Sequence, residues 1–348
     1  MKITTPGRIC LFGEHQDYLG LPIIALAISL RSSISAIERN DKKIIINLPD
    51  VNQVEEFSLN ELNYSKDRDY FKSAIKVCQK KGLIFSKGFE STIESSIPIQ
   101  AGVSSSSSIV VGWIKLISNL ADNPPNWDNQ TIGKLAYEAE VQEFDEPGGM
   151  MDQYTTALGG CIYLSQTPFF IKKLNSGLGA FVLGDSNQSK DTLNILKRCR
   201  EDRLTMMKKL NSRYPDLNFI NCNLEHGKSL LNHREQVLLE ATVKNREILI
   251  QAMKELDKSK LNHNKIGELL SEHHGVLQNL LKISTNKIDN MIKASIDAGA
   301  LGAKISGSGG GGCMFAYAPE NAMDVARAIN DSGGHATIIH SEDGTRID

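Results

Sequence analysis

The sequence predicts an α+β fold built from two halves, each with its own mixture of strands and helices. Residues 1–60 are rich in strand-like runs with alternating apolar positions. Residues 236–298 instead carry apolar side chains at helical spacing, in long amphipathic segments. Strand-like sequence then returns at 299–318 and 336–340. We therefore expect two α+β domains, the first at 1–172 and the second at 173–348.

The expected elements alternate between strands and helices along most of the chain. Alternating apolar residues indicate strands, and apolar residues at every third or fourth position indicate helices. The expected strands are 23–37, 43–48, 89–97, 161–164, 180–183, 313–317 and 336–340. The expected helices are 71–81, 109–120, 131–144, 150–158, 236–256, 265–282, 286–298 and 322–330. No period of about 20–50 residues recurs, so a solenoid is not expected.

Composition and charge narrow the kind of partner that the protein can have. Its 348 residues include 39 Lys and Arg against 41 Asp and Glu, and the formal net charge is −2. We therefore expect no nucleic acid and no anionic membrane surface as a partner, because both require a basic footprint. A phosphate-bearing ligand would have to be held by a local site, which favours a small molecule.

Cysteine usage and the first residues predict a cytoplasmic protein. The 6 cysteines are scattered, without a C-x-x-C pair or a zinc-like spacing, so we expect reduced, buried thiols. Residues 1–6 are too short and polar a start for a signal peptide. The longest apolar run, 21–30, is too short to cross a bilayer. We expect neither a leader nor a membrane segment.

The segment 6–20, P-G-R-I-C-L-F-G-E-H-Q-D-Y-L-G, is the most informative part of the chain. A strand-like run that carries Arg8 ends in a turn that contains Glu14, His15 and Asp17. Three side chains that donate or accept hydrogen bonds suit a polyhydroxy ligand, because each sugar hydroxyl needs a partner. An ordinary polar surface turn is the alternative interpretation of this segment.

A second informative segment, 98–108, lies between an expected strand and an expected helix. Gly102 permits a tight turn, and the serines that follow bring hydroxyls and free amides to a helix N-terminus. Such a helix start favours phosphate, because unpaired amides and the helix dipole both attract an anion. A serine there can also reach a phosphate-bound Mg²⁺. A serine N-cap or a flexible linker is the structural alternative.

The glycine-rich segment 299–316 formally contains G-x-G-x-x-G at Gly307, Gly309 and Gly312. In a dinucleotide-binding fingerprint these glycines lead from a strand into a helix. A strand-like run, 313–317, follows them here, so the dinucleotide interpretation is excluded. What remains is a glycine-rich loop between two strands. Because glycine has no side chain, the backbone of this loop can come close to another molecule or another part of the chain. No G-x-x-x-x-G-K-[ST] pattern occurs, which excludes a Walker-type P-loop.

Two acidic residues between these segments are candidates for chemistry. Glu140 falls on the apolar face of the expected helix 131–144, where a carboxylate needs a partner such as a metal ion or a lysine. Exposure at the edge of that face is the alternative. Asp152 follows a glycine turn at the start of a short expected helix, where an N-capping or first-turn aspartate is the ordinary explanation.

Taken together, these segments resemble the GHMP kinase superfamily, which includes galactokinase, homoserine kinase, mevalonate kinase and phosphomevalonate kinase. The segments 6–20, 98–108 and 304–313 resemble its motifs 1, 2 and 3, and they occur in the right order. Galactokinase-like sugar kinases are the most similar group. The residues that fit their motif 1 are Gly7, Arg8, Gly13, Glu14, His15, Asp17, Tyr18 and Gly20. The segment 149–153 resembles their G-I-M-D-Q, and Glu140 stands at the matching distance upstream.

The sequence also departs from the galactokinase pattern. Cys10 stands where that group has asparagine, and Phe12 stands where it usually has isoleucine. The segment 272–313 is more similar to mevalonate kinase, and the chain is short for a galactokinase. These departures concern the choice of galactose as substrate rather than the kinase chemistry.

The resemblance implies a two-domain GHMP kinase fold. The N-terminal domain would be of the ribosomal-protein-S5-like type with a left-handed β-α-β crossover, and the C-terminal domain would be ferredoxin-like. It also implies an ATP-dependent sugar kinase that uses Mg²⁺ and phosphorylates a free sugar at the anomeric hydroxyl, to give a sugar 1-phosphate. The active site would lie between the two domains.

Individual roles follow from the resemblance by position. Asp152 would accept the hydroxyl proton, and Arg8 beside it would stabilise the ionised carboxylate. Glu140 and Ser106 would hold Mg²⁺. The sugar would be bound by Glu14, His15, Asp17 and Asp152. The nucleotide would be bound by Pro98, Gly102, Val103, Ser104, Ser105, Ser106, Ser107, Gly307, Gly309 and Gly310.

Two other functions fit the same resemblance. Mevalonate-type kinases share Gly13, Glu14 and His15 but not an acid followed by an aromatic residue shortly after, so Asp17 and Tyr18 favour a sugar. A non-catalytic sugar sensor with the same fold is the other alternative. Such sensors tend to lose part of motif 2 or the base, whereas this chain retains the serines and both acids. The sequence leaves open which sugar binds, among galactose, arabinose and uronic acids, and the oligomeric state.

Overall fold

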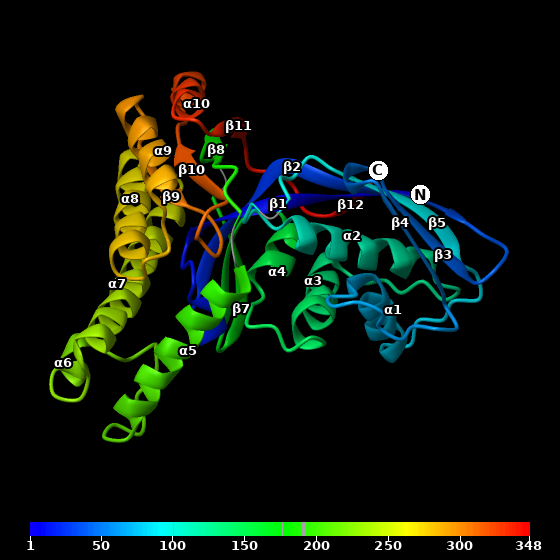
Figure 1. Ribbon diagram of the computed structural model, residues 1–348, viewed down its shortest axis with the longest axis horizontal. Helices are drawn as coiled ribbons and strands as arrows, with labels where there is room; N and C mark the ends of the chain where they lie inside the picture. The colour runs from blue at the N-terminus through cyan, green and yellow to red at the C-terminus, as the bar shows by residue number, and fades with distance from the viewer. Residues whose placement is uncertain (100, 176, 190–191) are drawn as a thin grey trace.

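The computed structural model describes residues 1–99, 101–175, 177–189 and 192–348, and Figure 1 shows its two layered parts. The larger part is an eight-stranded sheet with the order β12-β1-β2-β5-β3-β4, which β6 and β7 extend from β2. Its strands are β1 (Lys2–Phe12), β2 (Ile23–Glu38), β3 (Lys43–Leu48), β4 (Gln53–Ser58), β5 (Phe89–Ser95), β6 (Cys161–Gln166), β7 (Phe169–Leu174) and β12 (Arg346–Ile347). Strands β3 and β5 run parallel, and the other named pairs are antiparallel.

Four helices lie against one face of this sheet, below it in the view of Figure 1. They are α1 (Tyr70–Lys80), α2 (Ser105–Leu120), α3 (Asn129–Tyr137) and α4 (Met151–Leu158). Short helical turns η1 (Asp17–Leu19) and η2 (Pro49–Val51) connect β1 to β2 and β3 to β4, and η3 (Glu138–Gln142) follows α3. The apolar face of α2 buries Trp113 and Ile117 completely against the sheet, and burial of such a face is what stabilises a helix in a folded protein.

The smaller part is a four-stranded antiparallel sheet with the order β11-β8-β10-β9. Its strands are β8 (Phe181–Asp185), β9 (Gly302–Ile305), β10 (Cys313–Tyr317) and β11 (His335–Ile339). The helices of this half are α5 (Thr192–Asn211), α6 (Leu224–Gly227), α7 (His233–Leu256), α8 (His263–Asn279), α9 (Asn286–Asp297) and α10 (Ala322–Asp331). With its helical insertions, this strand order is that of a ferredoxin-like fold, as expected.

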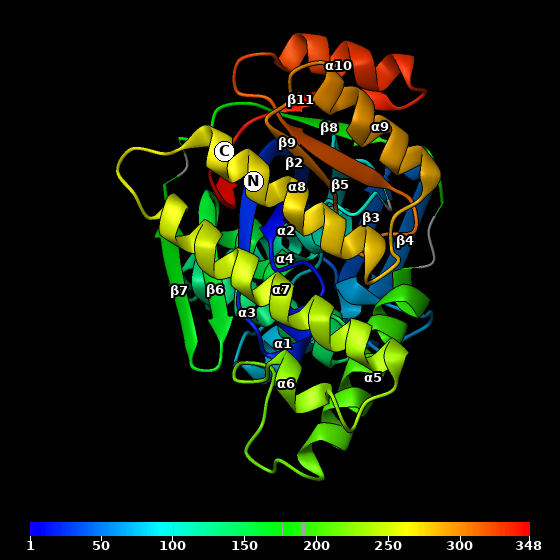
Figure 2. The ribbon, with the colours of Figure 1, turned by 90° about the vertical axis from the view of Figure 1, so that its left-hand side faces the viewer.

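A continuous apolar core joins the two parts. Leu11 and Leu26 of the first sheet belong to the same buried cluster as Leu249 of α7, Leu277 of α8 and Phe315 of β10. Figure 2 shows α7 and α8 side by side across this junction, and both helices contact β1. The exit of β1, where motif 1 lies, is therefore held between the two halves.

The expected strands and helices form, with ends that differ by a few residues. The exceptions are β4, β7, β12, α5 and α6, which the sequence did not predict. Helix α5 is 20 residues long, but its interior face buries only a few apolar side chains, such as Met206 and Leu210. Its periodic signal is therefore weak, and tertiary packing rather than intrinsic pattern establishes the helix.

The expected helix 131–144 is correct only in its first half. The α-helical pitch ends at Tyr137, and Glu138–Gln142 form a wider π turn. This turn buries three consecutive residues, Ala139, Glu140 and Val141, which a regular helix with 3.6 residues per turn would point in different directions. Wide turns of this type occur frequently at functional sites.

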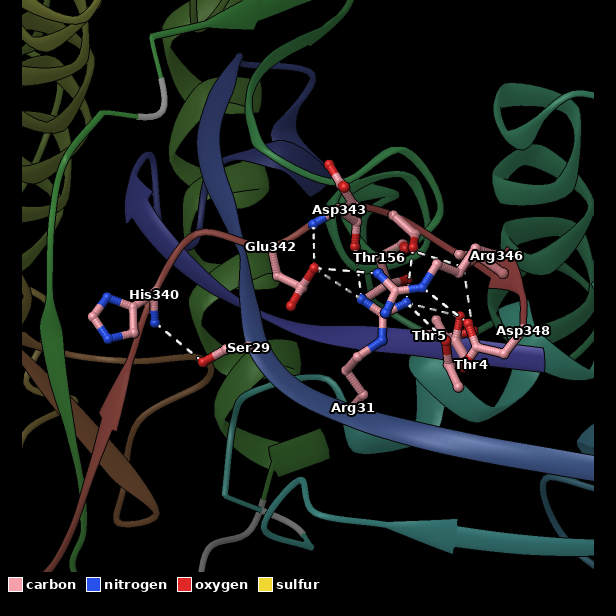
Figure 3. A network of polar contacts seen from close by, with 12 residues as sticks. Thr4, Thr5, Ser29, Arg31, Thr156, His340, Glu342, Asp343, Arg346 and Asp348 are labelled. Atoms are coloured by element: carbon pink, nitrogen blue, oxygen red, sulfur yellow. Dashed lines mark hydrogen bonds and ion pairs between the residues drawn. The ribbon is translucent and has the colours of Figure 1, made fainter. Parts of the chain in front are cut away.

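The C-terminal tail returns to the first sheet after the last strand of the second. Strand β12 pairs with β1, and isolated bridges join Ser341 to Ile28 and Asp343 to Gly159. Figure 3 shows Arg31 at the centre of this contact, where its guanidinium donates to the carbonyl of Asp343 at 2.9 Å. Residues 341–348 thus pack on the first part although they follow the predicted border at 172/173. The border itself stays a prediction.

Two simpler expectations can be compared with the structure directly. All 6 cysteines are buried and outside any disulfide, as their apolar contexts predicted. Within the described residues, none of the helices combines the length and apolar character needed to span a bilayer.

Candidate active site

Arg8 connects three segments that are far apart in the sequence. It lies on β1 and is 4% exposed. Its Nε and Nη2 atoms donate to Asp152 Oδ1 at 2.8 and 2.6 Å, and its Nη1 donates to the carbonyl of Gly102 at 2.7 Å. The Asp152 side chain keeps 29% of its surface exposed. An oriented carboxylate that a ligand can still reach, beside a fixed cation, has the properties of a general base.

Asp17 is a second carboxylate close to Asp152. It accepts hydrogen bonds from the amides of Tyr18, at 2.9 Å, and Met151. Its Oδ2 lies so close to Gly149 that a Cβ at that position would be 1.9 Å away, so a side chain there would displace the Asp17 carboxylate. Burial, and then the negative charge of Asp152, raise the pKa of Asp17 to about 6. The two acids therefore act on each other at the start of α4.

Glu14 forms an ion pair with Lys304 of the second sheet, and we call this pair closed because both side chains are buried. Its Oε2 lies 2.8 Å from Nζ of Lys304 on β9, and the same Nζ donates to the carbonyl of Cys10 at 2.8 Å. Lys304 is fully buried and Glu14 almost so. The Cys10 thiol points at the carbonyl of Phe12, 3.4 Å away, within a buried cluster. Any hydroxyl bound by Glu14 would have to use the acceptor positions that Lys304 leaves free.

His15 also has partners for both ring nitrogens. Its Nδ1 lies 2.8 Å from the Tyr18 hydroxyl, and its Nε2 lies 3.0 Å from the carbonyl of Ser308 in the glycine-rich loop. Burial, and then the nearby Arg203, lower the pKa of His15 to about 3, so the ring is neutral at physiological pH. A direct contact with a sugar hydroxyl would require one of these bonds to open. Sugar binding by His15 therefore stays a prediction.

Motifs 2 and 3 lie against each other. A Cβ on Gly307 would be 2.8 Å from the Cα of Gly102, so the two backbones touch where a side chain would separate them. The amide of Cys313 donates to the carbonyl of Ala101 at 2.8 Å, and Ser306 Oγ donates to the carbonyl of Gly102 at 3.3 Å. The glycine-rich loop of motif 3 therefore packs directly against the predicted phosphate-binding loop, motif 2.

The other predicted nucleotide residues surround the first turn of α2. Ser104 precedes the helix with a φ of 64°, and its buried hydroxyl has no hydrogen-bond partner among the described residues. Ser105 and Ser106 begin α2, and Ser106 is exposed. The carbonyl of Val103 accepts from the amide of Arg8 at 3.1 Å. The helix start is therefore open to an anion on the side of Ser106.

The remaining nucleotide predictions are spread more widely. The amide of Gly310 donates to the carbonyl of Ile283 at 2.7 Å, and Gly309 packs on the same residue. Pro98 lies at the start of the loop, and no described contact joins it to the residues above. Residue 100 of the same segment lies outside the described residues. The binding of ATP by this set stays a prediction.

Glu140 is buried next to the serines of motif 2. Its Oε2 accepts from Gln153 Nε2 at 2.6 Å, and the same nitrogen lies 3.3 Å from Ser107 Oγ. Burial raises the pKa of Glu140 to about 7, while hydrogen bonds from Gln153, Ser107 and Ser106 act in the opposite direction. Among the described residues, no basic side chain forms an ion pair with this carboxylate.

This environment fits a magnesium ion. A buried carboxylate without a cationic partner is unfavourable, and a divalent cation would supply the missing charge. Ser106 lies within hydrogen-bonding reach of Glu140, so both can act as oxygen ligands. The described residues contain no group of three or more His, Cys, Asp or Glu that could hold a metal alone. Mg²⁺ usually combines one or two protein ligands with water and phosphate oxygens, and Glu140 and Ser106 can supply the two protein ligands.

Sequence reasoning missed several residues at this site. Lys304 and Gln153 lie inside recognised segments but had no role, and Arg203 lies on the unpredicted helix α5. A lysine within an apolar strand is itself a signal, because a buried lysine needs a partner. The sequence around Arg203 contains no comparable signal, because the contact of Arg203 with Tyr18 depends on how α5 packs against motif 1.

The fold has two parts with glycine-rich and serine-rich loops in contact at their junction, and comparison with protein families gives its class. The profile of the GHMP kinases N terminal domain matches residues 69–160, and that of the GHMP kinases C terminal domain matches residues 249–335. A galactokinase galactose-binding signature matches residues 2–36. The chain belongs to the GHMP kinase family. Kinases of this family use ATP as the phosphoryl donor.

Individual relatives include both mevalonate kinases and galactokinases. The mevalonate kinase of Thermococcus gammatolerans is 31% identical over 360 residues, covering 99% of this chain and 97% of its own. The galactokinase of Clostridium perfringens is 27% identical over 368 residues, covering 97% and 91%. The structure of Lactococcus lactis galactokinase complexed with galactose matches with a TM-score of 0.84 at 23% identity, covering 99% of this chain and 94% of that one. That similarity establishes the fold.

Proposed function

We propose that the protein transfers the γ-phosphoryl group of ATP to the anomeric hydroxyl of a free sugar, giving a sugar 1-phosphate. The observation that carries this proposal is the galactose-binding signature over residues 2–36. Within it, Asp17 presents a carboxylate beside Asp152. Two adjacent acceptors suit a ligand with neighbouring hydroxyls, whereas a ligand without hydroxyls would leave them unpaired.

The chain's own residues divide the work of the reaction. Asp152 accepts the proton of the attacking hydroxyl, and Arg8 holds its Oδ1 so that the carboxylate stays oriented. Backbone amides of 102–107 bind the nucleotide phosphates at the N-terminus of α2, and the loop 307–310 closes against them. A magnesium ion held by Glu140 and Ser106 would neutralise phosphate charge. Phosphoryl transfer depends chiefly on such positioning and charge neutralisation.

Phosphorylation of mevalonate is the second candidate function. The observation that favours it is the 31% identity to a mevalonate kinase over nearly the whole chain. Mevalonate has few hydroxyls and one carboxylate, so it would require a cation at the acceptor position. The carboxylate of Asp17 argues against it at that place.

An assay of ADP release with ATP, Mg²⁺ and a panel of free sugars and mevalonate tests this proposal. Phosphorus NMR of the product would identify a sugar 1-phosphate by its anomeric position. We expect turnover with at least one free sugar and none with mevalonate. Turnover with mevalonate alone would overturn the sugar assignment and leave the family assignment in place.

A further inference from the structure

Helix α5 borders the candidate site from the second half of the chain. Near its start, Ser308 Oγ of the glycine-rich loop lies 3.4 Å from Thr192 Oγ1. Further along, Arg203 donates to the Tyr18 hydroxyl at 2.7 Å, and Tyr18 belongs to the same turn as Asp17. The helix thus extends from the loop proposed to meet phosphates to the turn proposed to meet the acceptor.

Arg200, on this helix, has a shielded Nε atom without a hydrogen-bond partner among the described residues. Arg200 lies one turn before Arg203 and on the same side, because side chains three apart are neighbours on a helix. It is half-buried, and its Nε atom is shielded from solvent without a hydrogen-bond partner. Nearby Arg198 donates to the carbonyl of Leu281, and Arg203 to Tyr18. No acidic side chain in the described part of the chain pairs with Arg200, although an unsatisfied buried donor is costly.

Arg200 and Asp17 share a common neighbour, Tyr137. Tyr137, at the end of α3, is within electrostatic reach of both Asp17 and Arg200: burial and then Asp17 raise the pKa of its hydroxyl, and Arg200 lowers it. Asp17 is held by the amides of Tyr18 and Met151 instead. Asp17 and Arg200 therefore act on the same phenol from two different elements, the turn after β1 and helix α5.

We propose that the acceptor sugar itself carries a carboxylate, which Arg200 binds while Asp17 and Asp152 face the hydroxyl groups. A hexuronic acid is the class of sugar that matches both features. A guanidinium suits this role because its planar donors can bind both oxygens of a carboxylate. This inference rests on the proposed sugar kinase function and narrows its substrate.

Other acceptors match only part of the arrangement. A neutral hexose would satisfy Asp17 but leave Arg200 without an acceptor. Mevalonate offers a carboxylate but too few hydroxyls for the acidic pair. A sugar phosphate would pair with Arg200 through a different anion, and it is therefore included as a separate arm of the test.

The experiment compares kcat/KM of the full chain for galactose, galacturonate, glucuronate, galactose 6-phosphate and mevalonate. The variants are Arg200→Gln, Arg200→Lys and, as a matched control, Lys197→Gln, which removes an exposed positive charge from the same helix. We expect wild type to prefer a uronate over galactose. We expect Arg200→Gln to lose about 100-fold on the uronate, as for a lost charge-assisted hydrogen bond, with little change on galactose. Arg200→Lys should recover part of this loss, and Lys197→Gln should behave like wild type.

The alternative results separate the two levels of the proposal. Equal or better use of galactose, unaffected by Arg200→Gln, would overturn the carboxylate inference and leave the sugar kinase assignment standing. An Arg200-dependent preference for galactose 6-phosphate would overturn the carboxylate in favour of a phosphate. Use of mevalonate alone would overturn both. If the variants fail to fold, competition between galactose and galacturonate on wild type decides, because preferential use of galactose contradicts the inference.

Discussion

Two ion pairs meet at motif 1, and they differ in their access to solvent. Glu14 and Lys304 are 2.8 Å apart, with side-chain exposures of 3% and 0%. Arg8 and Asp152 are 2.6 Å apart, but Asp152 keeps 29% of its side chain exposed. The first pair joins the two halves of the molecule, whereas the second leaves a carboxylate accessible from solvent. One short motif thus supplies both a structural contact and a candidate catalytic one.

The physical basis of this difference is desolvation. A closed pair loses water on both charges, so it contributes little net stability, but removal of one partner leaves a buried charge uncompensated. An open carboxylate keeps part of its hydration and can exchange water for a substrate hydroxyl. Mutation should therefore affect stability at the closed pair and turnover at the open one.

The largest effect is expected for Asp152→Asn, which keeps the shape of the side chain but removes its basicity. We expect kcat to fall by about 10²–10⁴-fold, the usual worth of general-base catalysis. Binding of ATP, measured by calorimetry, should remain close to wild type. Asp297→Asn, at an exposed position of α9, is the matched control and should keep full activity. Turnover by Asp152→Asn at the wild-type rate would remove Asp152 from the role of base.

The closed pair is tested by Lys304→Met, which leaves Glu14 buried without its partner. We expect the free energy of unfolding in urea to fall by about 3–5 kcal/mol. The double variant Lys304→Met/Glu14→Gln should recover much of this loss. Lys265→Met breaks an exposed pair with Glu268 and should cost less than about 1 kcal/mol. Equal losses for Lys304→Met and Lys265→Met would show that the buried pair has no special role.

The smallest effect is expected for Glu140. Among the described residues, its carboxylate forms neither a buried ion pair like that of Glu14 nor a partly exposed one like that of Asp152. Because its folded pKa is raised to about 7 from 4.5, the folded state binds more protons than the unfolded state between these values. Metal-free protein should therefore lose stability as pH rises from about 4.5 to 7. Glu140→Gln should flatten this dependence in thermal unfolding and raise the Mg²⁺ concentration for half-maximal rate. Curves that superimpose on wild type in both measurements would contradict the assignment.

The sequence was a good guide to the elements and to the chemistry of each motif taken singly. The strand-to-turn character of 6–20, the helix start near Ser105 and the loop between β9 and β10 are local properties, which follow from apolar periodicity and glycine content. The sequence did not predict α5, because few apolar residues on its face generate a period. It also predicted a regular helix where η3 widens to bury Glu140.

The tertiary structure decided which side chains pair with one another, whereas the helices and strands largely follow from the sequence. The sequence by itself determined that Arg8, Asp17, Glu140 and Asp152 belong to motifs of one family, since residue type and spacing are local information. Only the packed structure decided that Lys304 pairs with Glu14 and that the carbonyl of Ser308 contacts His15. It also decided that the Nε atom of Arg200 has no hydrogen-bond partner among the described residues. These contacts join residues nearly 300 positions apart. They depend on how two independently patterned halves meet around β1, and no local pattern in the chain encodes that meeting.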